Sequence, residues 1–238
     1  MRGGRWVLDV GNSRIKFASR ARDGAMQVLH DDAAYELALH LEPEAVLVAS
    51  SGVLPARWND LCSGWGERCI RLDAPTPEAL PSDYVPNESL GWDRVANALA
   101  VPSSGSWAIV DAGTCITCDL VVEGRFLGGS IAPGIVMRLQ AMHAGTALLP
   151  AVTREQAVQA VSDLGTSTLG SMAAGAVHGA RLEVAGRIRE WTLSHPDLSV
   201  VVTGGDGAVL GLNDSVRIFA DPDHTLKGYH VLLNRLKP

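Results

Sequence analysis

The sequence predicts an α/β fold made of two similar domains, each with a mixed sheet flanked by helices and with a cleft between them. The 238 residues include 25 glycines and are 47% hydrophobic, whereas aromatic residues make up only 5%. This balance suits a sizeable core with many tight strand-to-helix turns better than an all-β sandwich. Two further observations favour the fold: apolar strand patterns are interspersed with helical patterns, and one short motif occurs twice.

The repeated motif is a short apolar run that ends in Asp-x-Gly and is followed by a hydroxyl side chain. The first copy, residues 6–13, reads WVLDVGNS, and the second, residues 107–114, reads WAIVDAGT. The copies are too far apart for a solenoid, whose repeats recur every 20 to 50 residues or so. We therefore expect a duplicated domain. The Pro- and Ser-containing stretch 102–106 is the best linker, which divides the chain into domains 1–103 and 104–238.

Each copy continues in a way that predicts a β-hairpin, with glycine supplying the turn conformations. Continuous apolar runs elsewhere are typical of strands buried on both faces of a sheet. These later strands are predicted at 14–18, 45–49, 115–122, 125–128 and 200–203. Helices are predicted at 32–41, 92–100, 134–143, 156–160, 168–194 and 226–236. Small residues crowd the early part of the longest helix, which suits close packing against a sheet or another subunit.

Charge and composition exclude several classes of function. The net charge of −6 argues against nucleic-acid binding, because phosphate backbones require basic surfaces. The sequence shows neither a signal peptide nor an apolar stretch long enough to span a membrane, so we expect a cytoplasmic protein without membrane partners.

Two of the four cysteines, Cys115 and Cys118, form a CxxC for which a redox or zinc site is one interpretation. However, they fall in the strand predicted at 115–122, where residues three apart point to opposite faces. A second CxxC or a nearby His pair that would complete a tetrahedral site is also missing from the sequence. The pattern therefore favours ordinary strand residues.

The Asp-x-Gly motifs contain the residue types that a phosphate-binding hairpin needs. Glycine lets the backbone approach a phosphate closely, and backbone N–H groups with a hydroxyl can cradle its oxygens. An aspartate at a strand end can hold magnesium, and Lys16 on the first hairpin can neutralise phosphate charge. Two such hairpins indicate an ATP-dependent kinase in which Asp9 and Asp111 begin the nucleotide-handling loops.

Three further motifs each allow a functional and a structural interpretation. Residues 128–134 precede a helix and could bring backbone close to a substrate or phosphate, or merely permit tight packing. Residues 203–207 follow a strand and could carry an adenine or ribose, or form an ordinary turn. Asp93 lies in the first turn of a helix, where the helix dipole favours a carboxylate. It could instead serve as a base, with Arg94 as an anion clamp.

Five motifs occur in one order along nearly the whole chain: 9–16 (DVGNSRIK), 91–94 (GWDR), 111–114 (DAGT), 128–134 (GGSIAPG) and 203–206 (TGGD). Together they resemble the type III pantothenate kinases, a bacterial family of the sugar kinase and actin superfamily that includes the Bvg accessory factors. The resemblance implies two ribonuclease H-like (actin-like) domains. It also implies a homodimer that phosphorylates pantothenate with ATP to 4′-phosphopantothenate, the first step of coenzyme A biosynthesis.

The resemblance also implies roles for individual residues. ATP phosphates and Mg²⁺ would be bound by Asp9, Val10, Gly11, Asn12, Ser13, Arg14, Ile15 and Lys16, and ATP also by Thr114. Pantothenate would be bound by Tyr84, Gly91, Trp92, Asp93, Arg94 and Thr168, with Asp93 as the proton acceptor. Asp111 would hold a monovalent cation, K⁺ or NH₄⁺.

Two other interpretations stay open. An actin-like protein can bind ATP without turning it over, so the chain could be a non-catalytic regulatory accessory protein. It could also be another small-molecule kinase of the same superfamily. Asp93 and the two Asp-x-Gly motifs weigh against the first alternative, and residues 91–94 favour pantothenate over a sugar.

Overall fold

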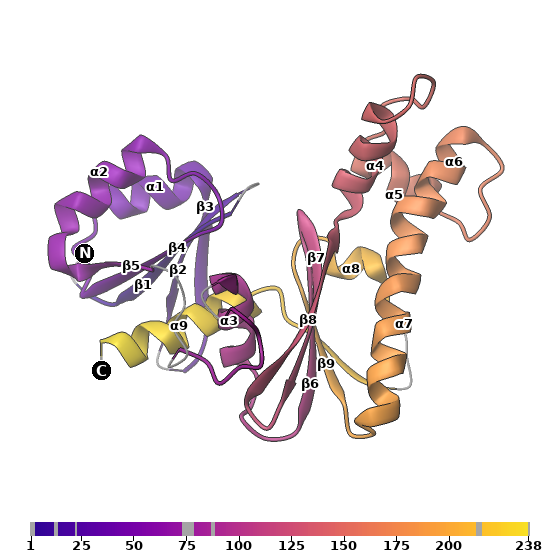
Figure 1. Cartoon of the computed structure of the whole chain (residues 1–238). Helices are drawn as coiled ribbons and strands as arrows, with labels where there is room; N and C mark the ends of the chain where they lie inside the picture. Colours follow the sequence, from indigo (N-terminus) through magenta and orange to yellow (C-terminus); the bar gives the residue numbers. More distant parts are fainter. Residues whose placement is uncertain are drawn as a thin grey trace. The chain divides into compact units, whose positions relative to one another are not determined.

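The computed structural model describes residues 3–11, 14–21, 23–72, 79–86, 89–212 and 216–237. They form two compact units (Figure 1). The first comprises the described residues of Met1–Ser103, Gly124–Phe126 and Asp223–Pro238, and the second those of Ser104–Glu123 and Leu127–Pro222. The division into domains 1–103 and 104–238 stays a prediction. In the structure, the C-terminal helix packs within the first unit.

The first unit is built on a five-stranded sheet in the order β3-β2-β1-β4-β5. Its strands are β1 (Arg5–Val10), β2 (Ile15–Arg20), β3 (Met26–His30), β4 (Ala45–Ser50) and β5 (Cys69–Arg71). The first three pair antiparallel, whereas β4 runs parallel to β1 and β5 parallel to β4. The sheet is therefore mixed, as expected.

Helices cover both faces of this sheet. They are α1 (Asp31–Leu39), α2 (Ala56–Trp65), α3 (Trp92–Ala100) and α9 (His224–Leu236), with a 3₁₀ turn η1 (Gly66–Arg68). Figure 1 shows α1 and α2 on one face and α3 and α9 on the other. Because side chains alternate along a strand, Trp6 enters the core under α1 and α2, where it stacks on Phe17. Its neighbour Val7 enters the core under α3 and α9.

Helices α3 and α9 cross in close contact. A Cβ atom placed on Gly228 would lie 1.9 Å from the carbonyl oxygen of Ala96, so only glycine fits there without movement. Near the start of α9, the Nε2 atom of His224 lies 3.0 Å from the carbonyl oxygen of Asn97. This crossing holds the helix whose first turn contains Asp93 and Arg94.

His230 makes the stability of the first unit sensitive to acid. Its side chain is 3% exposed, and Nε2 has no hydrogen-bond partner among the described residues. Burial lowers the pKa of this imidazole from 6.5 to about 4; Arg20 adds to the effect and a hydrogen bond with the Ala18 backbone opposes it. The unfolded chain thus takes up this proton at a higher pH than the folded chain.

We therefore expect the free energy of unfolding to fall as the pH drops from about 6.5 to about 4, by up to roughly 3 kcal/mol from this group. Urea denaturation over this pH range would measure the slope. His230→Leu should flatten it, whereas His30→Gln, at an exposed position on β3, should leave it intact. Equal slopes in wild type and His230→Leu would contradict the assignment.

The second unit repeats the topology of the first, with the strand order β10-β9-β6-β7-β8. Its strands are β6 (Ser106–Ala112), β7 (Cys115–Val122), β8 (Arg125–Pro133), β9 (Ser199–Thr203) and β10 (Arg217–Ala220). The central strand β6 pairs antiparallel with β7 and parallel with β9, as β1 pairs with β2 and β4. In each unit the central strand ends in the Asp-x-Gly motif, which explains the sequence repeat.

The helices of the second unit are α4 (Ile135–Ala144), α5 (Arg154–Ala160), α6 (Thr168–Ala173), α7 (Gly179–Ser194) and α8 (Gly207–Leu210). Helix α7 covers one face of the sheet through Ala180, Val184 and Ile188. Helices α4, α5 and α6 gather at one end of the sheet around a separate apolar core (Figure 1). The helix predicted at 168–194 contains a π-helical segment, Ala174–His178, whose small residues tolerate a widened turn.

The CxxC residues diverge as expected. Cys118 is buried with Ile116 in the core beneath α7, whereas Cys115 is half-buried and outside that core. Burial raises the pKa of the Cys118 thiol to about 12, with a contribution from the neighbouring Asp119 charge. The two thiols therefore do not form a shared site. Within the described ranges, every helix is too short or too polar to cross a membrane.

Candidate active site

Asp9 and Lys16 lie opposite each other at the end of the first hairpin. Asp9 is the next-to-last residue of β1, and its partner across the antiparallel ladder is Lys16 on β2. Directly opposed residues project from the same face. That face is the one on which Val7 and Ala18 pack beneath α3 and α9. The first unit thus combines a carboxylate and an ammonium group on the sheet face that α3 covers.

The turn after Asp9 is held by backbone contacts. The Gly11 N–H donates to the carbonyl oxygen of Arg14 at 3.0 Å. The Ile15 N–H donates to Oδ1 of Asp31 at 3.0 Å. Val10 is buried and Arg14 is exposed. Two residues predicted to bind ATP, Asn12 and Ser13, lie outside the described residues.

Asp111 occupies the equivalent place in the second unit but has different neighbours. It is the next-to-last residue of β6, and its partners in register are Thr117 on β7 and Thr203 on β9. Asp9 has Lys16 and Ala49 in the corresponding positions. One aspartate is thus flanked by a cation, and the other by two hydroxyl side chains.

Three of the sequence motifs meet at the second hairpin. A Cβ atom on Gly134 would lie 2.2 Å from the Gly113 oxygen, and the Gly134 N–H donates to the Thr114 oxygen at 3.0 Å. Gly204 has φ of +86°, and a Cβ there would lie 2.3 Å from the oxygen of Ala112. Both glycines are therefore required for close backbone approach to the residues around 111–114. The side chain of Thr114 is exposed beside these contacts.

The stretch 128–134 differs from the predicted loop. Strand β8 continues through Pro133, and Gly134 directly precedes α4. The sequence predicted only the start of this strand, at 125–128, because the glycines at 128 and 129 are typical of a turn. The contact between Gly134 and the second hairpin nevertheless brings the end of this motif to the site.

Arg154 is a residue that the sequence did not mark. From the first turn of α5, its Nε atom donates to Oδ1 of Asp206 at 2.5 Å, and Nη2 lies 3.4 Å from the Gly205 oxygen. Asp206 is buried, and its N–H donates to Ala112 at 2.9 Å. Arg154 thus anchors the glycine turn at 204–205. Because Arg154 and Asp206 are distant in the sequence, their spacing did not indicate that they would interact.

Thr168 is the first residue of α6, and its side chain is exposed. The helix is capped by the preceding residue, because the Ser167 hydroxyl accepts the Gly170 N–H at 3.0 Å. Thr168 belongs to the second unit, whereas the other residues predicted to contact pantothenate belong to the first.

Asp93 is placed by the start of α3. Gly91 precedes the helix, and the half-buried Trp92 begins it and packs against the core beneath α3 and α9. Oδ1 of Asp93 accepts the N–H of Arg94 at 2.9 Å. A Cβ on Gly91 would lie 2.4 Å from this same oxygen, so glycine makes room for the carboxylate. The hydrogen bond between Asp93 and the Arg94 N–H stabilises the start of α3. The role of Asp93 as a base stays a prediction.

Arg94 packs against two aromatic rings that also contact each other. Its side chain is buried, and the guanidinium carbon lies 5.2 Å from the ring centre of Tyr84 and 5.3 Å from that of Phe126. Nη1 also lies 3.5 Å from the Tyr84 hydroxyl oxygen. Such cation–π contacts fix the orientation of a guanidinium group. The structure therefore brings together Tyr84 and Arg94, both predicted to bind pantothenate.

Phe126 completes this cluster and was missed by the sequence analysis. Its N–H donates to the Pro81 oxygen, and its own carbonyl accepts the Asp83 N–H, both at 2.9 Å. These bonds join the start of β8 to the segment that carries Tyr84. The only signal in the sequence was a lone aromatic residue after the Glu-Gly turn, without a partner at a recognisable spacing.

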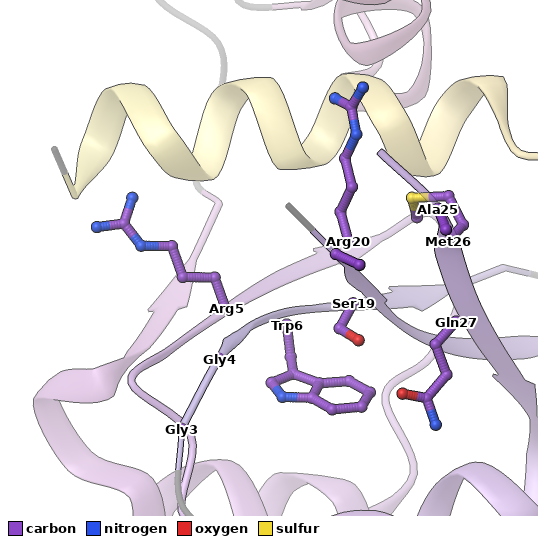
Figure 2. Close-up of a pocket in the computed structure, with 10 residues that line it drawn as sticks. Gly3, Gly4, Arg5, Trp6, Ser19, Arg20, Ala25, Met26 and Gln27 are labelled. Atoms are coloured by element: carbon purple, nitrogen blue, oxygen red, sulfur yellow. The ribbon is translucent and has the colours of Figure 1, made fainter. Parts of the chain in front are cut away.

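A separate pocket of about 280 Å³ lies at the other end of β1 from Asp9. It is lined by residues 3–6, 19–21 and 25–27, most of which Figure 2 labels. Arg5 is engaged by Glu44 and Asn234, and Figure 2 shows Arg20 extending towards α9. None of the residues predicted to bind ATP or pantothenate lines this pocket.

Solved structures place this fold among the actin-like proteins. A Campylobacter jejuni protein named as a Baf family transcriptional activator is 20% identical, with a TM-score of 0.60 over 98% of this chain and 100% of its own. A Cytophaga hutchinsonii protein named as a sugar kinase has a TM-score of 0.51 at 10% identity, with coverage of 98% and 100%. Porphyromonas gingivalis acetate kinase has a TM-score of 0.50 at 12% identity, with coverage of 99% and 100%. At these identities the likeness concerns the fold alone, and it confirms the predicted ribonuclease H-like class.

Sequence comparison is more specific. A family model for type III pantothenate kinase matches residues 6–190. The enzyme of that name from Christiangramia forsetii is 37% identical over 168 residues, which cover 69% of this chain and 68% of the relative. The one from Bacteroides fragilis is 31% identical over 241 residues, or 96% of each chain. The chain belongs to the type III pantothenate kinase family, which confirms the resemblance seen in the five motifs.

Proposed function

We propose that this protein transfers the terminal phosphoryl group of ATP to the primary hydroxyl of pantothenate, which yields 4′-phosphopantothenate for coenzyme A biosynthesis. Family membership supports the reaction. The structural observation that carries the proposal is the sheet face shared by Asp9, Lys16 and the start of α3. The hairpin proposed to bind phosphate and the helix whose first turn contains Asp93 and Arg94 are thus parts of one compact unit.

The first hairpin suits the phosphates of ATP. Lys16 would neutralise phosphate charge, and Gly11 would let the backbone after Asp9 approach the phosphate oxygens closely. Asp9 would hold the Mg²⁺ that accompanies ATP, and this ion would offset the charge that develops during transfer. Across the described part of the chain, His, Cys, Asp and Glu side chains do not gather in threes as an all-protein metal site. Mg²⁺ in kinases usually relies on one or two carboxylates plus substrate phosphates, so this arrangement fits.

The start of α3 suits pantothenate. Phosphoryl transfer depends mainly on positioning and charge neutralisation. With Oδ1 of Asp93 engaged by the Arg94 N–H, we assign Oδ2 the task of orienting the hydroxyl and accepting its proton late in the transfer. Arg94, which packs against Tyr84 and Phe126, would pair with the carboxylate of pantothenate. Gly91, Trp92 and Tyr84 would complete the substrate contacts.

The second unit contributes the remaining predicted contacts. The turn anchored by Arg154 and Asp206 would carry the adenosine, and Thr114 would contact ATP. Asp111, flanked by Thr117 and Thr203, presents oxygen ligands of the kind that K⁺ or NH₄⁺ takes. Thr168 would contact pantothenate. A homodimer is proposed from the family resemblance.

A coupled assay of ADP release tests the function directly. Purified protein is given ATP, Mg²⁺ and varied K⁺, with pantothenate, with a sugar, or without an acceptor. The proposal expects ADP release that depends on pantothenate. Release with another acceptor would identify a different kinase. Binding of ATP without ADP release under any condition would favour the non-catalytic regulator.

Arg94→Lys should raise the KM for pantothenate about 10- to 100-fold and leave the KM for ATP nearly unchanged. The reason is that lysine cannot form a bidentate pair with a carboxylate and stacks less well on the rings, and a hydrogen bond between charged groups contributes roughly 1.5–3 kcal/mol. Arg57→Lys is a matched control, because Arg57 lies over the Tyr35 ring on the surface of the same unit. An unchanged KM for pantothenate in Arg94→Lys would contradict the carboxylate contact.

A further inference from the structure

An open surface cavity of about 500 Å³ lies between α2 and β5 in the first unit. It is lined by Asn59, Cys62, Ser63, Gly66, Cys69 and Arg71. None of these residues is assigned to ATP or pantothenate, and the proposed phosphoryl transfer makes no use of them. The cavity contains two of the four cysteines of the chain, both as free thiols, which raises the question of their chemistry.

The two thiols are hydrogen-bonded to each other and differ in exposure. Cys62 is 2% exposed in the aromatic core beneath α1 and α2. Cys69, at the start of β5, is half-buried and packs against that core. Both thiols line the same cavity, where the Cys62 thiol donates a hydrogen bond to Cys69. One thiol is thus open to small reagents, and the other is sheltered directly behind it.

Arg71 makes the exposed thiol the more acidic one. Residues two apart on a strand share a face, so Arg71 lies on the same side of β5 as Cys69. Its guanidinium is held there by Asn59, to which Nη2 donates at 2.8 Å. The hydrogen bond from Cys62 and the charge of Arg71 lower the pKa of Cys69 to about 7, against the opposing effect of burial. The same hydrogen bond, together with burial, raises the pKa of Cys62.

Within the described part of the chain, the other neighbours of Cys69 do not compete with Arg71. Its neighbour on β4 is the apolar Val46. The preceding residue, Arg68, directs its guanidinium to the carbonyl oxygens of Trp65 and Pro43. Arg71 is therefore the charged group that acts on this thiol, and Cys62 is its hydrogen-bond donor. A thiolate beside a cation, with a second thiol in contact, is the arrangement of a reactive cysteine with a resolving partner.

We propose that Cys69 and Cys62 form a dithiol site that reacts with hydrogen peroxide and closes to a reversible disulfide. The Cys69 thiolate attacks one peroxide oxygen, so that an S–O bond forms while the O–O bond breaks. Hydroxide leaves and takes up a proton, Cys69 becomes a sulfenic acid, and the peroxide is reduced to water. The Cys62 sulfur then attacks the Cys69 sulfur. The S–S bond forms, the S–O bond breaks, and the hydroxyl group leaves with the Cys62 proton as a second water.

Hydrogen peroxide is the probe for the first test. The folded protein is treated briefly, alkylated, digested without reductant and mapped by mass spectrometry. We expect two peptides joined by a disulfide between Cys62 and Cys69. Their combined mass should be lower by two hydrogen atoms than that of the separate peptides, and reductant should separate them. Cys115 and Cys118 are internal controls and should stay reduced. A map without this link, or with oxidation spread equally over Cys115 and Cys69, would overturn the proposal.

Alkylation rates provide a second test. Iodoacetamide should modify Cys69 faster than Cys115, with a half-maximal rate at about pH 7. Arg71→Met should move that midpoint upward, and the rates should converge above the new midpoint. In Cys62→Ala, a dimedone reagent should trap a persistent sulfenic acid on Cys69. A midpoint near the ordinary cysteine value in wild type would refute the thiolate. None of these measurements depends on kinase activity, so they are independent of the proposed function.

Discussion

Replacing Asp93 with asparagine is expected to lower kcat about 10²- to 10⁴-fold while pantothenate still binds, because a positioned base contributes roughly that factor. The substitution removes the proton-accepting charge but retains an oxygen in the place of Oδ1. That oxygen can still accept the Arg94 N–H, so the start of α3 should persist. Initial rates at saturating ATP and pantothenate measure kcat, and calorimetric titration with pantothenate measures binding.

Asp32→Asn is the matched control for this experiment. Asp32 also lies in the first turn of a helix of the first unit, but on α1, where it pairs with Arg57 at the surface. Its replacement should leave kcat within about twofold of wild type, because an exposed ion pair contributes little to stability. If Asp93→Asn kept near-normal turnover, Asp93 would be a helix-start residue only, and the base would have to be sought elsewhere.

Replacing Gly228 with alanine is expected to destabilise the first unit by about 1–3 kcal/mol or more, although alanine is the better helix former. The added Cβ would lie 1.9 Å from the Ala96 oxygen and 2.4 Å from its carbonyl carbon, both backbone atoms that cannot move aside alone. Helix α3 or α9 must shift, and the first turn of α3 would move with it. Urea denaturation measures the loss, and pantothenate-dependent turnover should fall in parallel.

Gly64→Ala should have the opposite effect on stability. Gly64 lies inside α2 of the same unit, and a Cβ there would meet no atom within 4 Å. Alanine should therefore stabilise by roughly 0.5–1 kcal/mol through helix propensity alone. The two Gly-to-Ala changes thus differ in the expected sign. A stabilised Gly228→Ala would show that the α3–α9 crossing is not as close as described.

The central elements of the fold were predictable because their signals are local and strong. The Asp-x-Gly repeat predicted the duplicated sheets, since each copy ends a central strand that is buried on both faces. Helix α3 and strand β7 were predicted with their observed bounds, Trp92–Ala100 and Cys115–Val122. A glycine precedes α3, and a Glu-Gly turn follows β7, so both had clear ends.

Strands β3, β5 and β10 and helix α2 were missed because their patterns are weak. Strands β3, β5 and β10 are short edge strands with one neighbour each, so neither continuous apolar character nor strict alternation is required of them. Helix α2 contains Asn59, Asp60 and Gly64, which lower helix propensity. It is fixed instead by tertiary packing of Trp58, Cys62 and Trp65 into the core.

The sequence indicated which short motifs belong to the candidate site, but it did not indicate which residues contact one another there. The family resemblance assigned pantothenate contacts to residues 91–94 and Tyr84, but it did not indicate that Phe126 would pack against Arg94 beside Tyr84. Nor could it show that Arg154 anchors the turn that carries Asp206. Both contacts join segments distant in sequence, and they follow from strand pairing and helix packing that local patterns do not encode. The packing of α9 with the first unit is a third contact of this kind.

The most direct test of the account is phosphorus NMR of the material formed from pantothenate, ATP and Mg²⁺ by the purified protein. The expected result is a new phosphomonoester signal, coupled to the methylene protons of the primary alcohol of pantothenate, that grows with an equal amount of ADP. Inorganic phosphate as the sole new product beside ADP, or an unchanged ATP spectrum in the presence of pantothenate, would contradict it.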